Sequence, residues 1–205
     1  MNWWEKDKDL VWHPFTQHGL AGPPVPIVMA KDAVIYAADG KEYIDAISSW
    51  WVNTWGHAHP EIAKAIQEQA EQLEQVIFAG FTHEPAVRLA ESLQDILPGS
   101  PRRIFFSDNG STSVEVAMKM AIQYWHNQGK PRKRIIAFEN GYHGDTFGAM
   151  SAGKSAFFSA FEPFLFDVIQ LPVPVGSNFE NVLGQFKSHV GTGEVAAFIF
   201  EPLVQ

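Results

Sequence analysis

A short polar segment at residues 107–113, Ser-Asp-Asn-Gly-Ser-Thr-Ser, contains the residue types that bind phosphate groups. Apolar residues predict a strand over 103–107 before it, and an amphipathic helix follows it. The free N–H groups and the positive dipole end of such a helix attract an anion, and Gly110 lets the backbone approach that anion closely. Ser111 and Ser113 can add hydroxyl donors. The segment therefore predicts a phosphate site, although an ordinary polar helix cap would contain the same residues.

The helix after this segment is predicted from the spacing of its apolar residues. From Val114 onward they recur at intervals of three and four, which gives one buried stripe. Thr112 and Glu115 form a T-x-x-E capping box that marks the helix start, and Glu115 and Lys119 form an i, i+4 pair on the outer face. The segment lacks the lysine of the nucleotide-binding P-loop, so it does not have that pattern.

A second polar loop, residues 139–148, follows a strand predicted over 134–138. It contains Tyr142, His143 and Asp145, and it leaves the carboxyl end of its strand as the first loop does. Ligands of open α/β sheets bind at that edge. The two loops together predict a site for a flat phosphorylated ligand, with the phosphate on Gly110 and Ser111 and the ring against Tyr142. Generic loop chemistry remains the alternative for either loop taken separately.

The composition limits the classes of function. The chain has 205 residues, of which 46% are hydrophobic, and a net charge of -8 without a block of like charges, so nucleic acid and anionic membranes are not expected as partners. No cysteine is present, which excludes disulfides, thiolate metal sites and a cysteine nucleophile. Charged residues replace the apolar run of a signal peptide near the amino terminus, and we expect a cytoplasmic protein.

The amino-terminal part is predicted to contain an arm, a hairpin and a site loop. Prolines favour an irregular arm over residues 1–30, and Asp39-Gly40 predicts a hairpin between strands at 33–36 and 42–46. Residues 48–59 follow no regular period and contain Trp50, Trp51, His57 and His59. The tryptophans are either core residues or the wall of a cavity or interface. A zinc site at the two histidines would need a third ligand, which the nearby sequence lacks, so helix-entry histidines are favoured.

The remaining chain alternates apolar strands with helices, which predicts an α/β fold with a mostly parallel sheet covered by helices on both faces. Residues 1–59 are predicted to form the arm and a small-domain segment with an antiparallel unit, and residues 60–205 the larger domain. The further predicted elements are helices at 60–77, 85–97 and 179–189, and strands at 167–171 and 195–200.

These motifs resemble the class III, fold type I aminotransferases, which depend on pyridoxal 5′-phosphate. The resemblance is carried by residues 107–121 and by Gly141-Tyr142-His143-Gly144-Asp145-Thr146. It extends over nearly the whole chain, through Trp12-His13-Pro14-Phe15-Thr16, Gly56-His57-Ala58-His59-Pro60-Glu61 and Phe200-Glu201-Pro202. It implies that Gly110 and Ser111 bind the cofactor phosphate, that Tyr142 stacks on the pyridine ring, and that Trp50 and Trp51 line the substrate pocket. Phe15 stands where many members have a substrate-contacting Tyr.

Within the class, the motifs are similar to members that act in biotin synthesis. Asp145 supports this assignment, because relatives acting on ornithine-like or ω-amino substrates more often have Arg there. The resemblance implies transfer of the amino group of S-adenosylmethionine to 7-keto-8-aminopelargonic acid, giving 7,8-diaminopelargonic acid, in a homodimer with active sites between subunits. The alternatives are another class III ω-amino acid transaminase and, if 205 residues are the native length, a non-catalytic fragment that binds pyridoxal phosphate or phosphate.

The family pattern also predicts what this sequence does not contain. Members have an Asp that pairs with the pyridinium nitrogen and a Lys that forms the Schiff base, both beyond the position that matches Gln205. The chain therefore resembles the amino-terminal half of the enzyme, with an incomplete large domain and no catalytic residue of its own, and we expect it to be inactive alone. Lys154 matches no Schiff-base motif and is predicted to be a solvated loop residue.

Overall fold

The computed structural model describes residues 2–99, 103–153 and 155–203, so Lys154 lies outside the described residues. The chain forms two units, one up to Ser92 and one from Leu93 onward, and their boundary falls within helix α4 (Glu84–Ile96). The sequence-based division between residues 59 and 60 stays a prediction.

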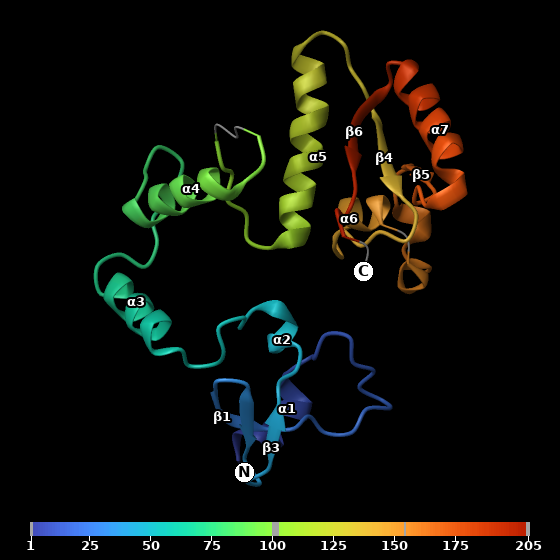
Figure 1. Ribbon diagram of the computed structural model, residues 1–205. Coiled ribbons are helices and arrows are strands. Elements are labelled where there is room, and N and C mark those ends of the chain that lie inside the picture. Colours follow the sequence, from blue (N-terminus) through green and yellow to red (C-terminus); the bar gives the residue numbers. More distant parts are fainter. Residues whose placement is uncertain (1, 100–102, 154, 204–205) are drawn as a thin grey trace. The chain divides into compact units, whose positions relative to one another are not determined.

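The N-terminal unit contains a small antiparallel sheet of order β1-β2-β3, shown in blue in Figure 1. Its strands are β1 (Ile27–Lys31), β2 (Val34–Ala37) and β3 (Glu42–Ile44). Gly40 has a φ of 85° in the turn between β2 and β3, and the N–H of Lys41 donates to Asp39 Oδ1 at 3.1 Å. The predicted hairpin is confirmed, and β1 extends it by one strand that was not predicted.

The arm is less irregular than predicted, because helix α1 occupies Trp3–Leu10. The prediction was wrong here because the first proline of the chain lies after this helix, so nothing prevents a helical turn. The carboxylate of Glu5 accepts the N–H of Asn2 at 2.8 Å and closes the start of the helix.

The next helices in the chain after β3 are α2 (Ser48–Trp51), α3 (Pro60–Ala70) and α4. Helix α3 ends seven residues before the predicted end at 77, which is a correction to the periodicity argument. An apolar stripe lengthens a helix only where it packs, and α3 contains no buried residue. Leu73 and Ile77 therefore lie beyond the helix.

The C-terminal unit is built on a parallel sheet of order β5-β4-β6. The central strand β4 (Arg134–Phe138) pairs with β5 (Ile169–Leu171) on one side and with β6 (Val195–Ile199) on the other. The connecting helices are α5 (Gly110–Asn127), α6 (Phe147–Ala152) and α7 (Phe179–Gly191), with 3-10 turns at Ala156–Phe158, Glu162–Phe164 and Gly176–Asn178.

Helices cover both faces of this sheet, as Figure 1 shows for α5 and α7. Successive residues of β4 point to opposite faces: Ile135 packs with Met118 of α5 and Ala152 of α6, and Ile136 packs with Val182 of α7. Ile135 and Ile136 are 1% and 0% exposed. The predicted α/β fold with a parallel sheet and a small antiparallel unit is confirmed.

Two local predictions in this unit were wrong. Residues 103–107 form no strand, because a strand requires a hydrogen-bonded neighbour and the described sheet consists of β5, β4 and β6. The loop predicted to run to Gly148 ends earlier, since α6 begins at Phe147. The helix at 179–189 and the strand at 195–200 are confirmed as α7 and β6 to within two residues. The strand at 167–171 is shorter, as β5.

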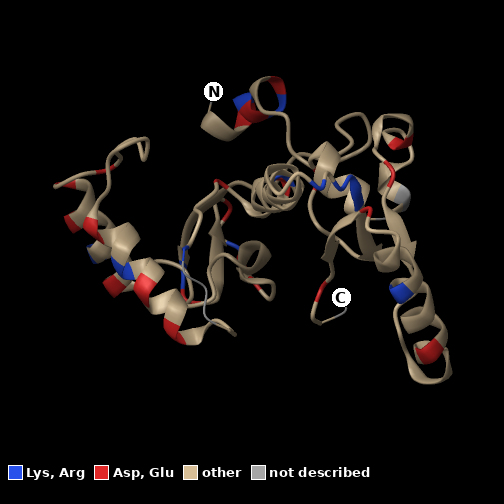
Figure 2. Ribbon diagram, turned by 90° about the horizontal axis from the view of Figure 1, so that it is seen from above, with Lys and Arg blue, Asp and Glu red and all other residues tan. Residues whose placement is uncertain are grey.

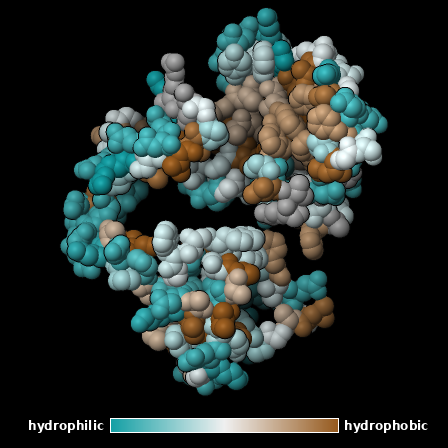
Figure 3. Space-filling model, in the orientation of Figure 1, coloured by the Kyte–Doolittle hydropathy of each residue, from teal (hydrophilic) through white to brown (hydrophobic). Residues whose placement is uncertain are grey.

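The surface contains charges of both signs, dispersed along the ribbon in Figure 2. Large apolar side chains are also exposed on the C-terminal unit, among them Phe157, Phe164 and Phe200, and brown apolar patches are visible on this unit in Figure 3. Among the described residues, the helices are too short or too polar to cross a bilayer.

Candidate functional site

Helix α5 begins at Gly110 and is capped by Asn109. Asn109 Oδ1 accepts the N–H of Thr112 at 3.0 Å, and Thr112 Oγ1 accepts the N–H of Asn109 at 3.1 Å. The reciprocal capping pair is thus Asn109 and Thr112, which corrects the predicted pair of Thr112 and Glu115. The reason is that Asn109 lies three residues before Thr112, and its short side chain reaches the free N–H of Thr112 at the start of the helix.

The capping leaves two backbone donors at the helix start. The N–H of Thr112 is bonded to Asn109 Oδ1, and that of Ser113 is bonded to Asn109 O at 3.0 Å. Within the described residues, no hydrogen bond uses the N–H of Gly110 or Ser111. A Cβ built on Gly110 would meet open space. The first turn therefore presents two N–H groups at its positive end, with open space beside Gly110, which fits an anion.

The serine hydroxyls of this turn differ in their availability. Ser113 Oγ donates to Asn109 O at 2.9 Å, so its proton is already engaged, contrary to its prediction as a ligand donor. Ser111 Oγ instead accepts the N–H of Asp145 at 3.1 Å. A hydroxyl that accepts one hydrogen bond still has its own proton to donate. Ser111 can thus donate both a hydroxyl and a backbone N–H to one anion.

The second predicted loop lies directly against this turn. Gly144 adopts a φ of 125°, and a Cβ there would overlap the side chain of Ser111, so the close approach requires glycine. Tyr142 is about half exposed, and its hydroxyl donates to Asp145 Oδ2 at 2.8 Å. Partial burial and then the hydrogen bond to Asp145 raise the pKa of Tyr142 above its ordinary value, so its ring remains neutral and its O–H remains a donor.

Glu115, predicted on the outer face of α5, instead contacts the start of α6. Its Oε1 atom accepts three hydrogen bonds, from the hydroxyl of Thr146 at 2.5 Å and from the N–H groups of Gly148 at 2.7 Å and Ala149 at 3.3 Å. Among the described residues no ion pair joins it to Lys119. The sequence pattern could not reveal this role, because the partners lie more than thirty residues away.

His143 lies beside Tyr142 in the same loop. Burial lowers the pKa of this imidazole, and the carboxylate of Glu201 acts in the opposite direction. Its buried Nε2 atom has no hydrogen-bond partner within the described part of the chain. The side chain is therefore held neutral near pH 7 at the carboxyl edge of the sheet.

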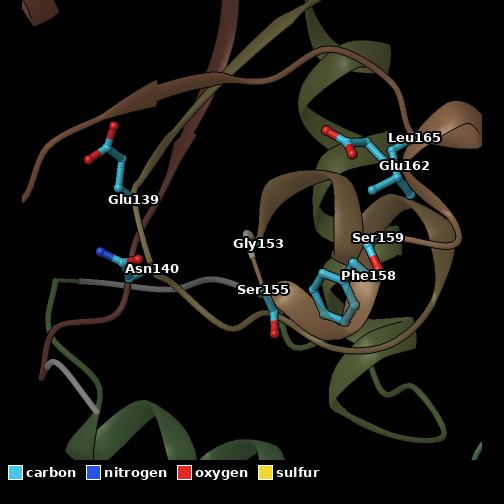
Figure 4. A pocket seen from close by; sticks show the side chains of 8 residues that line it. All are labelled: Glu139, Asn140, Gly153, Ser155, Phe158, Ser159, Glu162 and Leu165. Carbon is cyan, nitrogen blue, oxygen red and sulfur yellow. The ribbon is translucent and has the colours of Figure 1, made fainter.

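A cavity of about 480 Å³ opens at the end of β4 (Figure 4). Glu139 and Asn140 form one side of it, and Ser155, Phe158 and Glu162 lie on the other side. None of the predicted site residues lines it, so the cavity adjoins the loop of Tyr142 without containing that residue.

The predicted substrate residues lie in the N-terminal unit. Trp50 and Trp51 are in α2, a turn in which four consecutive residues from Ser48 have φ between 46° and 66°, the left-handed region. The rings of Phe15 and Trp50 meet edge to face with centroids 5.2 Å apart. Phe15 is 77%, Trp50 55% and Trp51 71% exposed, so these rings form a surface of this unit rather than its core.

Asp45 supports the left-handed turn and was not recognised from the sequence. Its carboxylate accepts the backbone N–H and, at 2.7 Å, the hydroxyl of Ser49, and its Oδ2 lies 2.8 Å from His57 Nε2. These hydrogen bonds, those of Ser49 first, hold the pKa of Asp45 well below its ordinary range. His57 thus pairs with a carboxylate, and no group of three potential metal ligands is found among the described residues.

The chain was compared with known proteins. Residues 16–205 match the family described as Aminotransferase class-III. The chain is 53% identical over 204 residues to the adenosylmethionine-8-amino-7-oxononanoate aminotransferase of Synechococcus elongatus, and 40% identical over 218 residues to that of Geobacter sulfurreducens. These alignments cover 95% and 97% of this chain and 48% of each relative. The chain therefore spans about half the length of the relatives it matches.

Solved structures agree with the sequence match. The adenosylmethionine-8-amino-7-oxononanoate aminotransferase of Methanocaldococcus jannaschii superposes with a TM-score of 0.87 at 34% identity, over 95% of this chain and 45% of that one. The omega transaminase of Pseudomonas jessenii, solved in complex with PMP, gives a TM-score of 0.90 at 27% identity, over 100% of this chain and 49% of that one. The chain belongs to the class-III aminotransferases, a family that depends on pyridoxal phosphate.

Proposed function

We propose that the native protein containing this chain transfers the amino group of S-adenosylmethionine to 7-keto-8-aminopelargonic acid, giving 7,8-diaminopelargonic acid in biotin biosynthesis. The observation that carries this proposal is the 53% identity to a relative named for that reaction, compared with 27% to the omega transaminase of similar fold. The fold is shared by enzymes of different specificity, so the higher sequence identity, and not the fold, favours this reaction.

Gly110, Ser111 and Tyr142 are proposed to hold the cofactor. The two N–H groups that the cap leaves at the start of α5 and the hydroxyl of Ser111 would bind the phosphate, and the open space at Gly110 would admit it. The neutral ring of Tyr142, tied to Asp145, would form a flat surface for the pyridine ring. When bound, pyridoxal phosphate supplies the electron-withdrawing ring that amino-group transfer requires.

Phe15, Trp50 and Trp51 are proposed to line the substrate pocket. Both substrates carry long apolar or ring-bearing parts, and exposed aromatic rings offer a surface on which such parts can be buried. The edge-to-face contact of Phe15 with Trp50 orients one ring by the other. Phe15 lacks the hydroxyl that many family members have at this position, so we propose an apolar rather than a hydrogen-bonded contact there.

The reaction is tested by incubating the purified native protein with pyridoxal phosphate, S-adenosylmethionine and 7-keto-8-aminopelargonic acid. Mass spectrometry should detect 7,8-diaminopelargonic acid, and its formation should require both substrates. The control replaces S-adenosylmethionine by β-alanine or an aromatic ω-amine. Faster turnover with such an amine than with S-adenosylmethionine would reject the biotin-pathway reaction and favour an ω-amino acid transaminase.

We also propose that the native protein is a cytoplasmic homodimer. Support comes from the abundance of exposed aromatic residues on the described surface, since large homodimer interfaces are rich in such side chains. Light scattering at micromolar concentration should give twice the mass of the native chain, and a monomer would contradict the proposal. Fractionation of cells should recover the protein with the cytosol.

A further inference from the structure

Two contacts join the loop of Tyr142 to helix α5. At one end Ser111 accepts the N–H of Asp145, and Asp145 in turn accepts the hydroxyl of Tyr142. At the other end Glu115 accepts hydrogen bonds from the hydroxyl of Thr146 and from the N–H groups of Gly148 and Ala149. Ser111 and Glu115 lie one helical turn apart on α5, so both ends of the tetrapeptide 145–148 are attached to the same face of one helix.

The contact of Glu115 leaves little freedom for either partner. A Cβ built on Gly148 would overlap both carboxylate oxygens, so the backbone of α6 approaches as closely as a glycine allows. Three donors converge on the single atom Oε1, two of them N–H groups from the positive end of α6. Hydrogen bonds to a charged acceptor are shorter and stronger than those to a neutral one, so a carboxylate suits this place better than an amide.

We propose that Glu115 is a positioning residue for the cofactor ring, and this rests on the proposed function. Through Thr146 and the first turn of α6 it fixes Asp145, and through Asp145 it fixes Tyr142 relative to the phosphate-binding turn at Gly110 and Ser111. The turn itself is capped independently by Asn109. Glu115 therefore governs the alignment of the ring with the phosphate site, and not the phosphate site as such.

Because Glu115 is proposed to affect the ring and not the phosphate site, its substitution should weaken binding of pyridoxal phosphate but not of inorganic phosphate. The apo form of the native protein is titrated with pyridoxal phosphate, followed by quenching of tryptophan fluorescence, and inorganic phosphate is used as a competitor. In Glu115→Ala the Kd for pyridoxal phosphate should rise roughly tenfold, as expected for loss of hydrogen bonds to a charged group. The inhibition constant of inorganic phosphate should change less than about twofold, because the capped turn remains.

A second readout reports the fixed orientation of the ring. The visible circular dichroism of the cofactor, per bound molecule, should fall in Glu115→Ala, since a less rigid site imposes less asymmetry on the chromophore.

Glu115→Gln keeps an acceptor oxygen and should retain most of the affinity and of the circular dichroism signal. Thr146→Val and Gly148→Ala disturb the same contact from the other side, and each should change the affinity in the same direction as Glu115→Ala. Glu180→Ala, an exposed glutamate in the first turn of α7, is the matched control and should change neither readout.

The results of these titrations decide whether Glu115 is a positioning residue. Unchanged affinity and circular dichroism in Glu115→Ala would overturn the positioning role while leaving the cofactor assignment intact. Equal loss of affinity for pyridoxal phosphate and inorganic phosphate would also overturn it, because Glu115 would then maintain the helix end in general. If the unsubstituted protein does not bind pyridoxal phosphate, the proposed function itself fails. If Glu115→Ala does not fold, the same comparisons with Thr146→Val give the decision.

Discussion

Trp50 is the residue at which the proposed substrate pocket can be tested most directly. In the native protein Trp50→Ala should raise the KM for S-adenosylmethionine or the keto acid about tenfold, because an aromatic wall contributes stacking and apolar burial of this order. The Kd for pyridoxal phosphate should remain within about twofold of the unsubstituted value, since the phosphate donors are elsewhere. Steady-state kinetics and cofactor titration provide the two numbers. Loss of cofactor with unchanged KM would show that Trp50 has been assigned wrongly.

Asp45 accepts hydrogen bonds from Ser49, the residue before Trp50, and the stability that these bonds contribute should depend on pH. A carboxyl whose pKa is lowered in the folded protein contributes stability above its unfolded pKa of about 3.9 and loses that contribution as the pH falls toward the folded value. The unsubstituted protein should therefore be more stable than Asp45→Asn at pH 7. This advantage should shrink as the pH is lowered below about 4.

Urea unfolding of both proteins between pH 7 and pH 3 measures this difference. Asp39→Asn is the control: the pKa of Asp39 is also lowered, first by its hydrogen bond to Lys41, but this pair is exposed, so its removal should change the free energy of unfolding little at any of these pH values. A difference between the unsubstituted protein and Asp45→Asn that stays constant across this range would contradict the ionic role of Asp45.

At the scale of elements, the turn α2 is the most strained segment described. Each L-residue in the left-handed region costs roughly 1–2 kcal/mol, and Ser48 through Trp51 all lie there. The hydrogen bonds to Asp45 help to offset this cost. Such strain is found where a site requires a backbone shape that local preference would not select.

Ser48→Gly should relieve part of this strain. Glycine accepts a φ of 49° without penalty, and after subtraction of its larger unfolded-state entropy the N-terminal unit should gain about 0.5 kcal/mol. Ser48→Ala, which keeps the β-carbon, is the matched control and should bring no gain. Thermal unfolding followed by tryptophan fluorescence compares the two. If both substitutions have the same effect, the left-handed turn is not strained at Ser48.

The elements also show which parts of the structure could be predicted from the sequence. Strand β4 and helices α5 and α7 were recognised because their signals are local: an apolar run or a stripe of apolar residues. The end of α3, the missing strand at 103–107 and the left-handed turn depend on which other segment packs alongside. That information is not contained in local periodicity.

The site was predictable to the same extent. Gly110 and Ser111 were identified from residue types at a helix start, and Tyr142 from a polar loop at the carboxyl end of a strand. The structure brings these two loops into contact through Ser111 and Asp145. Their roles stay predictions until cofactor binding is measured. Glu115 and Asp45 were missed as supporting residues, because their hydrogen-bond partners are distant in sequence or lie in a turn of unusual backbone geometry.

At the scale of the whole molecule, the described core centres on β4. Ile136 is completely buried between β5, β6 and α7, so Ile136→Ala should lower the free energy of unfolding of the native protein by about 2–5 kcal/mol. Ile136→Val should cost about 0.5–1.5 kcal/mol. Ile66→Ala, at a position that is 65% exposed in α3, should cost much less. Urea denaturation measures all three, and equal costs at Ile136 and Ile66 would place the core elsewhere.

The strand order β5-β4-β6 also has a consequence for folding during synthesis on the ribosome. Strand β4 is synthesised before both of its neighbours. The edge of β4 that pairs with β6 stays unpaired until Val195, the partner of Arg134, has been synthesised. Domains are synthesised from the amino terminus at about 5–20 residues per second, so β4 spends seconds outside the exit tunnel with unpaired edges. Among the described strands of this sheet, the central one is therefore the one that a nascent chain leaves unpaired longest.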